Sequence, residues 1–374
     1  MATIMFQAPN GIGLGHISRL SAIALAVRDK APSVKLPFVL EGSVNLLLKA
    51  ASLPCIQLPN IKEMHRDKGW EAWSEVEQRM IVLELAGSII SQIQPDVILF
   101  DSLPCDAVIT AAIRRRTPLA LCLRKIKDAD SPDFFAWLER VQEYFNLIII
   151  PHDAKEMKVP DHWLPKTHFV GQIVRPIEKT QLIKDSTSGR KTVVICGGGG
   201  GYPNTVDFYN SALSAFSRIH SQNPDLTGIL VAGPLFRDWL KLKMVDGVRM
   251  IPFATDLTSM FASSDLVICQ AGYNTVAEVS VLGVPTICVP AERYFDDQFE
   301  RAERIAASAP NFYVCRASEI DKIANLINSC IQLPARVASN EVTESNGAKL
   351  AADLLLDLVH KSRPISDGQR SRYD

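Results

Sequence analysis

Short apolar runs rich in β-branched residues alternate along this chain with longer segments of helical periodicity. The runs that predict strands are Thr3–Ala8, Leu36–Leu40, Val97–Phe100, Leu119–Leu123, Leu147–Ile150, Val193–Cys196, Gly228–Val231, Leu266–Cys269, Thr286–Val289 and Phe312–Cys315. The segments that predict helices are Ile17–Val27, Val76–Ile93, Phe134–Tyr144, Val206–Ile219, Val276–Leu282, Phe299–Ala307 and Ala348–Lys361. Strands that are apolar on both faces and alternate with helices are typical of a covered parallel sheet. Because the alternation occurs twice, it predicts an α/β protein of two doubly wound, Rossmann-like domains.

A change in composition marks the boundary between the two predicted domains. The segment GQIVRPIEKT is followed by the polar run KDSTSGRK, and a strong predicted strand comes next. Such a polar stretch is typical of a linker. The predicted parts are an N-terminal domain at 1–170, a linker at 171–188, a C-terminal domain at 189–345, a helix at 346–362 with the option of packing back on the N-terminal domain, and a polar tail at 363–374.

Composition and charge exclude several classes of protein. The 374 residues are 47% hydrophobic and 22% charged, which is enough apolar material for two buried cores. With 40 Lys and Arg against 41 Asp and Glu, no net basic field favours nucleic acid or an anionic membrane. No apolar run reaches about 18 residues and the N-terminus has no signal-like pattern, so we expect no stable membrane insertion. The eight cysteines include no CxxC pair, which indicates a reduced, cytoplasmic protein.

The first predicted strand leads into a loop in which Gly11, Gly13 and Gly15 alternate before a helix begins. Glycines at such a turn let the backbone approach a ligand, and the helix start offers free N–H groups and a positive dipole end. The spacing does not match the G-x-G-x-x-G pattern of dinucleotide-binding domains. A nicotinamide-dependent dehydrogenase therefore stays only as a minor alternative.

His16 ends this loop at the carboxyl edge of the predicted sheet, where ligands of such domains bind. A neutral imidazole can accept a proton from a hydroxyl near neutral pH, so we predict a catalytic or ligand-contacting residue. The alternative is a histidine hydrogen-bonded locally at a helix start. Asp101 ends a strand at the same edge and can orient the ring; the alternatives are an Asx-turn or a helix cap, with Asp106 as the fallback partner.

A second glycine loop, Gly197–Gly201, follows the first predicted strand of the C-terminal half. Five consecutive glycines cost folding free energy because they lose much backbone entropy. A phosphate or a closely bound substrate would use the bare backbone, whereas a flexible surface loop is the alternative. The absence of GK[ST] after the loop excludes a P-loop ATPase or kinase.

A third candidate ligand site begins at Gly272 and Asn274, which precede another predicted helix. Glu278 is expected in the first turn of that helix, where its carboxylate can accept hydrogen bonds from the two hydroxyls of a ribose. The Thr275-x-x-Glu278 spacing fits a helix capping box equally well.

These segments resemble a known family when they are taken together. The run from Gly272 to Glu278, then Gly283-Val284-Pro285, Val289-Pro290 and Asp297-Gln298, resembles the nucleotide-sugar-binding half of inverting GT-B glycosyltransferases. It is most similar to the family of the N-acetylglucosaminyltransferase that makes the peptidoglycan lipid intermediate, with a family 28-like C-terminal domain. The Gly11–His16 loop and the segment Val170–Arg175 resemble further parts of that family in the same order. The resemblance covers nearly the whole chain, and it implies the GT-B fold with two parallel sheets facing across a cleft.

The resemblance also implies roles for individual residues. His16 is the general base or an acceptor contact in the acceptor-binding N-terminal domain. The implied nucleotide and phosphate contacts are Gly13, Gly15, Arg175, Gly199, Gly200, Phe253, Gly272, Asn274, Thr275 and Glu278, and the donor-sugar contacts are Asp297 and Gln298. No metal-binding DxD segment is seen, so no cofactor is expected and helix dipoles take the place of Mg²⁺ at the diphosphate.

The predicted function is an inverting, metal-independent transfer of a sugar from a nucleoside-diphosphate sugar, with UDP the expected nucleotide. The acceptor is expected to be a hydroxyl of a soluble small molecule. The sequence departs from the family at two places. The all-glycine second loop leaves the phosphate contacts to the backbone alone, and Asp297 in place of Gln favours a different sugar, such as one with an amine. The segment from Gly13 to Arg19 also resembles the G-x-G-H-x-x-R start of a nucleotide-sugar hydrolase. A hydrolase, a 2-epimerase and a non-catalytic accessory binder are therefore the alternatives.

Overall fold

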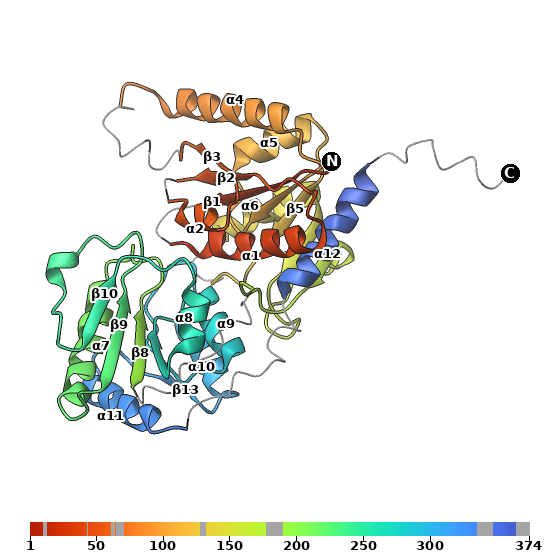
Figure 1. Cartoon of the computed structure of the whole chain (residues 1–374). Coiled ribbons are helices and arrows are strands. Elements are labelled where there is room, and N and C mark those ends of the chain that lie inside the picture. The colour runs from red at the N-terminus through yellow and green to blue at the C-terminus, as the bar shows by residue number, and fades with distance from the viewer. Residues whose placement is uncertain are drawn as a thin grey trace.

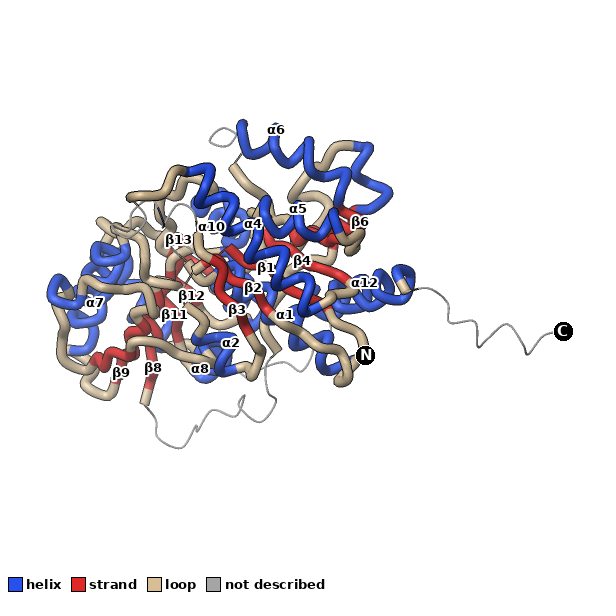
Figure 2. Tube along the Cα trace, turned by 90° about the horizontal axis from the view of Figure 1, so that it is seen from above, coloured by secondary structure: helices blue, strands red, loops and turns tan. Residues whose placement is uncertain are grey.

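The computed structural model describes residues 1–9, 13–42, 44–60, 64, 71–127, 132–176, 190–334 and 347–363. The chain forms two α/β domains, each with a parallel sheet between two layers of helices (Figure 1). The predicted linker is described only as far as residue 176, and of the predicted tail only Arg363 is described. Seen from above, the strands run between the flanking helices in both domains (Figure 2).

The N-terminal sheet has seven parallel strands in the order β3-β2-β1-β4-β5-β6-β7. The strands are β1 (Ile4–Pro9), β2 (Phe38–Glu41), β3 (Cys55–Leu58), β4 (Val97–Asp101), β5 (Leu119–Cys122), β6 (Phe145–Ile150) and β7 (Thr167–Phe169). The strand order reverses between β1 and β4, and ligands bind beyond the carboxyl ends of the strands at such a point. The helices that follow β1 and β4 therefore leave this edge toward opposite faces of the sheet.

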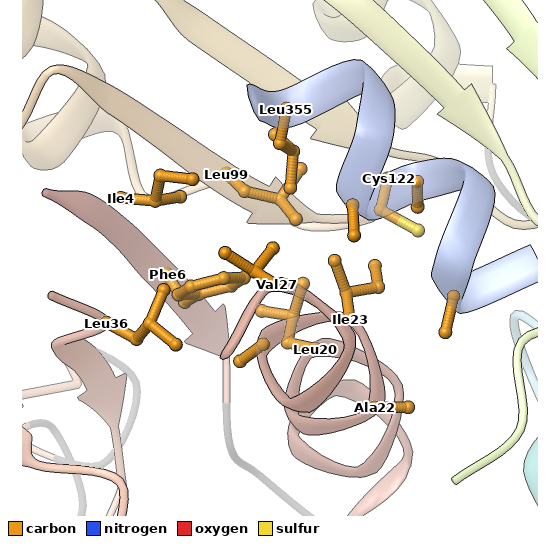
Figure 3. Packing of buried hydrophobic residues seen from close by; sticks show 14 of the residues in the cluster. Ile4, Phe6, Leu20, Ala22, Ile23, Val27, Leu36, Leu99, Cys122 and Leu355 are labelled. Carbon is orange, nitrogen blue, oxygen red and sulfur yellow. The ribbon is translucent and has the colours of Figure 1, made fainter. Parts of the chain in front are cut away.

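Two helical layers cover this sheet. On one face lie α1 (Gly15–Lys30), α2 (Leu46–Ala50) and α12 (Gly347–Ser362), and on the other lie α4 (Glu75–Ile93), α5 (Asp106–Arg114) and α6 (Pro132–Val141). The short helices η3 (Gln142–Tyr144) and η4 (Asp161–Lys166) flank β6. Helix α12 comes from the far end of the chain, and its Leu355 packs with Leu20 and Ile23 of α1 in one core (Figure 3).

The C-terminal sheet has six parallel strands in the order β10-β9-β8-β11-β12-β13. The strands are β8 (Lys191–Cys196), β9 (Leu226–Val231), β10 (Val248–Ile251), β11 (Leu266–Cys269), β12 (Thr286–Cys288) and β13 (Phe312–Val314). Helices α7 (Thr205–His220) and α11 (Ile320–Ile331) pack on one face, and α8 (Leu257–Ser263), α9 (Tyr273–Leu282) and α10 (Gln298–Ala306) pack on the other. A short helix, η7 (Trp239–Lys241), precedes β10.

The two domains contact each other through α1 and the first turn of α9 (Figure 1). A second contact surrounds Asp296, which accepts hydrogen bonds from Arg124 of the N-terminal domain and from Arg301 of its own domain. Burial raises the pKa of Asp296, but the two guanidiniums outweigh burial and lower it to about 2. A charged carboxylate thus joins the domains near neutral pH.

Candidate active site

The site is built around Asp101, a fully buried carboxylate at the end of β4. Its Oδ1 lies 2.7 Å from Nδ1 of His16, in the first turn of α1. Arg19, one turn further along α1, donates from Nε to Oδ2 at 2.8 Å and from a terminal nitrogen to Oδ1 at 2.6 Å. The carboxylate therefore holds both the imidazole and a guanidinium, and the predicted pairing of His16 with Asp101 is present.

The charges of this cluster follow from its burial and pairing. Burial raises the pKa of Asp101, but Arg19 and His16 outweigh it and hold that pKa well below its usual range. The carboxylate is therefore ionised and accepts the proton on Nδ1 of His16. Within the described part of the chain, Nε2 of His16 has no hydrogen-bond partner, and the side chain is 21% exposed. Nε2 is thus the nitrogen that can accept a proton from a bound hydroxyl.

The helix-cap alternative for Asp101 is excluded by the structure. Helix α5 has Cys105, not Asp101, as its N-cap residue. The fallback candidate Asp106 is exposed and accepts a hydrogen bond from Trp137 at 3.1 Å, so it is not the partner of His16.

Arg19 was not predicted as a site residue. Its side chain is only 2% exposed, although it carries a charge on a helix whose other buried residues are mostly apolar. A charged residue one helical turn after His16, on the buried face of α1, was the available signal. Its partner lies 82 positions away in the sequence, so the pairing itself could not be read from local spacing.

The two glycine loops meet across the domain boundary. A Cβ added to Gly199 would lie 3.2 Å from the Cα of Gly13, so the loops touch through bare backbone. Gly200 has φ +81°, and a Cβ there would lie 2.4 Å from the carbonyl oxygen of Ala232. The backbone N–H of Gly197 donates to the hydroxyl of Tyr209 at 3.0 Å. This loop is therefore tightly packed, which contradicts the alternative of a flexible surface loop.

Helix α9 begins beside this contact. Its N-cap residue is Gly272, and no side chain caps the helix, so the capping-box alternative for Thr275 and Glu278 is wrong. The side-chain amide of Asn274 donates to the carbonyl of Gly15 at 2.8 Å, which joins the start of α9 to the start of α1. The predicted phosphate contacts Gly13, Gly15, Gly199, Gly272 and Asn274 are thus brought together next to His16.

Glu278 lies in the second turn of α9 rather than the first, and its side chain is 3% exposed. Its Oε1 accepts a hydrogen bond from Nε of Arg175 at 3.2 Å. Arg175 also donates to the carbonyl of Thr255 at 3.1 Å. The predicted ribose contact and the predicted phosphate contact are therefore ion-paired with each other. Phe253, predicted near the base, is half-buried and packs against the core of the N-terminal domain.

Asp297 and Gln298, the predicted sugar contacts, lie at the start of α10. Asp297 caps the helix by accepting from the N–H of Glu300 at 2.9 Å. Gln298 is 5% exposed, its Oε1 accepts from the N–H of Ala291 at 3.0 Å, and its side-chain amide donates to the carboxylate of Asp296. Asp297 also lines a cavity of about 670 Å³, together with Lys127, Asn204, Gln270 and Arg316.

Among the described residues, no group of three or more His, Cys, Asp or Glu residues is arranged to hold a metal ion. No helix in the same set of residues is both long and apolar enough to cross a bilayer.

Known proteins resemble this chain in both sequence and structure. Residues 207–355 match the glycosyltransferase family 28 C-terminal domain. The UDP-N-acetylglucosamine--N-acetylmuramyl-(pentapeptide) pyrophosphoryl-undecaprenol N-acetylglucosamine transferase of Rhizobium leguminosarum bv. trifolii is 31% identical over 181 residues, which is 46% of each chain. The transferase of the same name from Lawsonia intracellularis is 23% identical over 92% of this chain and 95% of its own. The glycotransferase of kitacinnamycin has a TM-score of 0.64 at 16% identity, over 96% of this chain and 99% of its own.

These findings confirm the predicted GT-B fold and the predicted resemblance to that family. The stronger matches, near 31% identity, span about half the length of the curated relatives. One relative that covers 92% of this chain is 23% identical to it.

Proposed function

We propose that this chain, a GT-B glycosyltransferase with a family 28 C-terminal domain, moves a sugar from a nucleoside-diphosphate sugar to a hydroxyl acceptor with inversion. One observation carries the proposal: the start of α9 contacts the start of α1 through Asn274 and Gly15. The helix start expected to bind the donor diphosphate therefore adjoins the helix turn that bears His16. A base beside the donor is what an inverting transfer needs.

In the proposed reaction the acceptor oxygen attacks the anomeric carbon while the bond from that carbon to the diphosphate oxygen breaks. Nε2 of His16 takes the hydroxyl proton. Asp101 holds the ring through Nδ1 and stabilises the imidazolium that forms. The nucleoside diphosphate leaves with the bonding electron pair.

The donor contacts are proposed from the same geometry. Backbone N–H groups of Gly199 and Gly200 and of the α9 start stabilise the leaving diphosphate through their dipoles, without a metal ion. Glu278 binds the ribose hydroxyls. Arg175, which is hydrogen-bonded to that carboxylate, contacts the phosphates of the donor with its guanidinium. Asp297 binds the sugar at the cavity that it lines, next to Gln298, whose side chain is held by Ala291 and Asp296. UDP is the proposed nucleotide.

For the acceptor we propose a soluble small molecule, whereas the named relatives act on a pyrophosphoryl-undecaprenol intermediate. The basic run Arg114–Arg116 ends α5. Because a helix that follows a strand of a parallel sheet runs back along it, this run lies at the amino edge of the sheet, away from His16 at the carboxyl edge. It therefore supplies no anionic-membrane anchor beside the site. Eight free cysteines support a reduced, cytoplasmic setting.

Phosphorus NMR tests the proposal with UDP-, dTDP- and GDP-sugars, first without and then with a panel of soluble and lipid-linked acceptors. We expect release of one nucleoside diphosphate that accelerates with an acceptor. His16→Ala should slow it by about 10²–10⁴-fold while donor binding persists. Glu278→Gln should weaken donor binding. Equal release with and without any acceptor would favour the hydrolase, and no donor binding would refute the proposal.

A further inference from the structure

Tyr273, the first residue of α9, is inserted between the two domains. The guanidinium carbon of Arg19 lies 5.2 Å from the centre of its ring, and that of Arg301 lies 5.7 Å away. The ring of His152 packs against it edge to face at 5.2 Å. Its hydroxyl donates to the carbonyl of Pro151. A side chain of the C-terminal domain is thus surrounded by N-terminal residues on several sides.

A continuous set of contacts leads from this ring to His16. The ring covers Arg19, the forked guanidinium of Arg19 holds both oxygens of Asp101, and Asp101 holds Nδ1 of the imidazole. A guanidinium bound in this two-pronged way has a fixed plane, so its orientation sets that of the carboxylate. An aromatic face over the guanidinium stabilises that plane further.

On the C-terminal side, Arg301 anchors the same turn of α9. It donates to the carbonyl of Ala271 at 2.8 Å and also to Asp296, which is bound by Arg124 across the boundary. The ring of Tyr273 therefore contacts two guanidiniums, one fixed by the fully buried Asp101 and the other by Asp296, whose side chain is 15% exposed. It reaches this position only while the two domains are docked.

We propose that Tyr273 is a positioning residue that couples docking of the two domains to the orientation of His16, an inference that rests on the proposed function. Tyr273 touches neither the reacting atoms nor the imidazole and acts through Arg19 and Asp101. When the domains separate, Arg19 stays paired with Asp101 but loses its aromatic cover, so the plane of the guanidinium is less restricted. The base is then fully oriented only while the domains are docked.

The test compares Tyr273→Leu, which removes the ring, with Tyr273→Phe, which removes only the hydroxyl. Tyr144→Leu, an exposed tyrosine on η3, is the matched control. Turnover is measured at saturating donor and acceptor, and UDP affinity is measured separately by titration. We expect Tyr273→Leu to lower turnover at least about tenfold, since general base catalysis contributes about 10²–10⁴-fold in all. Its UDP affinity should stay within about threefold of wild type, and Tyr273→Phe should restore most of the turnover.

A spectroscopic measurement separates failure of this inference from failure of the proposed function. Histidine-ring ¹⁵N NMR of the ligand-free protein, with His16→Gln for assignment, reports which ring nitrogen carries the proton. We expect His16 to be held as the Nδ1–H form in wild type and Tyr273→Phe, and to show mixed or broadened signals in Tyr273→Leu. An unchanged His16 signal in Tyr273→Leu would overturn the coupling even if no transfer activity is found. A fall in turnover that is matched by weaker UDP binding would also overturn it.

Discussion

Asp101→Asn is the substitution that tests the site most directly. Oδ1 accepts from both His16 and Arg19, and Oδ2 accepts from Arg19 alone. Asparagine keeps one acceptor oxygen and replaces the other with an NH₂ group. Whichever way the amide turns, this NH₂ faces a donor. If it faces His16, the ring must move its proton to Nε2, and the nitrogen that should accept the substrate proton is lost.

The size of the effect follows from burial. Arg19 is 2% exposed and Asp101 is fully buried, so the substitution leaves a buried guanidinium without its counter-charge. Breaking such a pair from one side costs about 3–5 kcal/mol of the free energy of unfolding. Because the pKa of Asp101 is lowered in the folded state, its stabilisation is complete above the unfolded pKa and is lost as pH falls through the folded one. Measurements near neutral pH therefore report the whole contribution.

The assay is urea unfolding at neutral pH, followed by circular dichroism, for Asp101→Asn, Arg19→Met and the double variant. We expect the double variant to be at least about 2 kcal/mol more stable than the sum of the single losses predicts. Asp106→Asn, an exposed carboxylate on α5, is the control, and its loss should stay below about 1 kcal/mol. A loss below about 1 kcal/mol for Asp101→Asn, or additive single losses, would refute the reasoning.

Three further predictions concern the glycine loop, a buried histidine and the contact between the domains. Gly200→Ala should lower the free energy of unfolding by about 1–3 kcal/mol in thermal denaturation, because φ is +81° and the new Cβ meets the carbonyl of Ala232. Gly13→Ala is the control, and its loss of unfolding free energy should be smaller because the space around the new Cβ is open. Burial lowers the pKa of His152 below 6.5, despite a hydrogen bond with Glu156. Because the folded state disfavours the charged imidazole, the stability of the wild type in thermal denaturation should fall as pH drops through 6.5. His152→Asn should flatten that pH dependence. Asp296→Asn removes the carboxylate between two guanidiniums at the domain boundary and should increase the radius of gyration in small-angle scattering; an unchanged radius would contradict the role of this contact.

The sequence predicted the elements that are buried on both faces and missed several that are not. Strand β1 and helix α7 were predicted to within a few residues, because their apolar patterns are long and regular. Strand β10 was missed because it lies at a sheet edge and carries exposed Arg249 and Met250. Strand β3, at the edge of the other sheet, was missed for the same reason, since its Ile56 and Gln57 are exposed.

The residues of the candidate site were also predicted only in part. The glycine loops and His16 were predicted because glycine and histidine at a strand-to-helix turn carry a local signal. Arg19 and Tyr273 were not predicted, since each has a role only through partners far along the chain. The pairing of Arg175 with Glu278, over 103 positions, is of the same kind.

The sequence by itself determined two α/β domains, the loops at the carboxyl edges of their sheets and the resemblance to a glycosyltransferase family. These features depend on periodicity and on residue types at local turns, where backbone geometry follows from neighbouring residues. Only the tertiary structure decided which charges are buried together and which loops meet, as when Asp101 is held by Arg19 and Tyr273 enters the opposite domain. Burial and distance between remote residues set the strength of these contacts, because a charge pair withdrawn from water acts through its geometry and surroundings rather than its spacing along the chain.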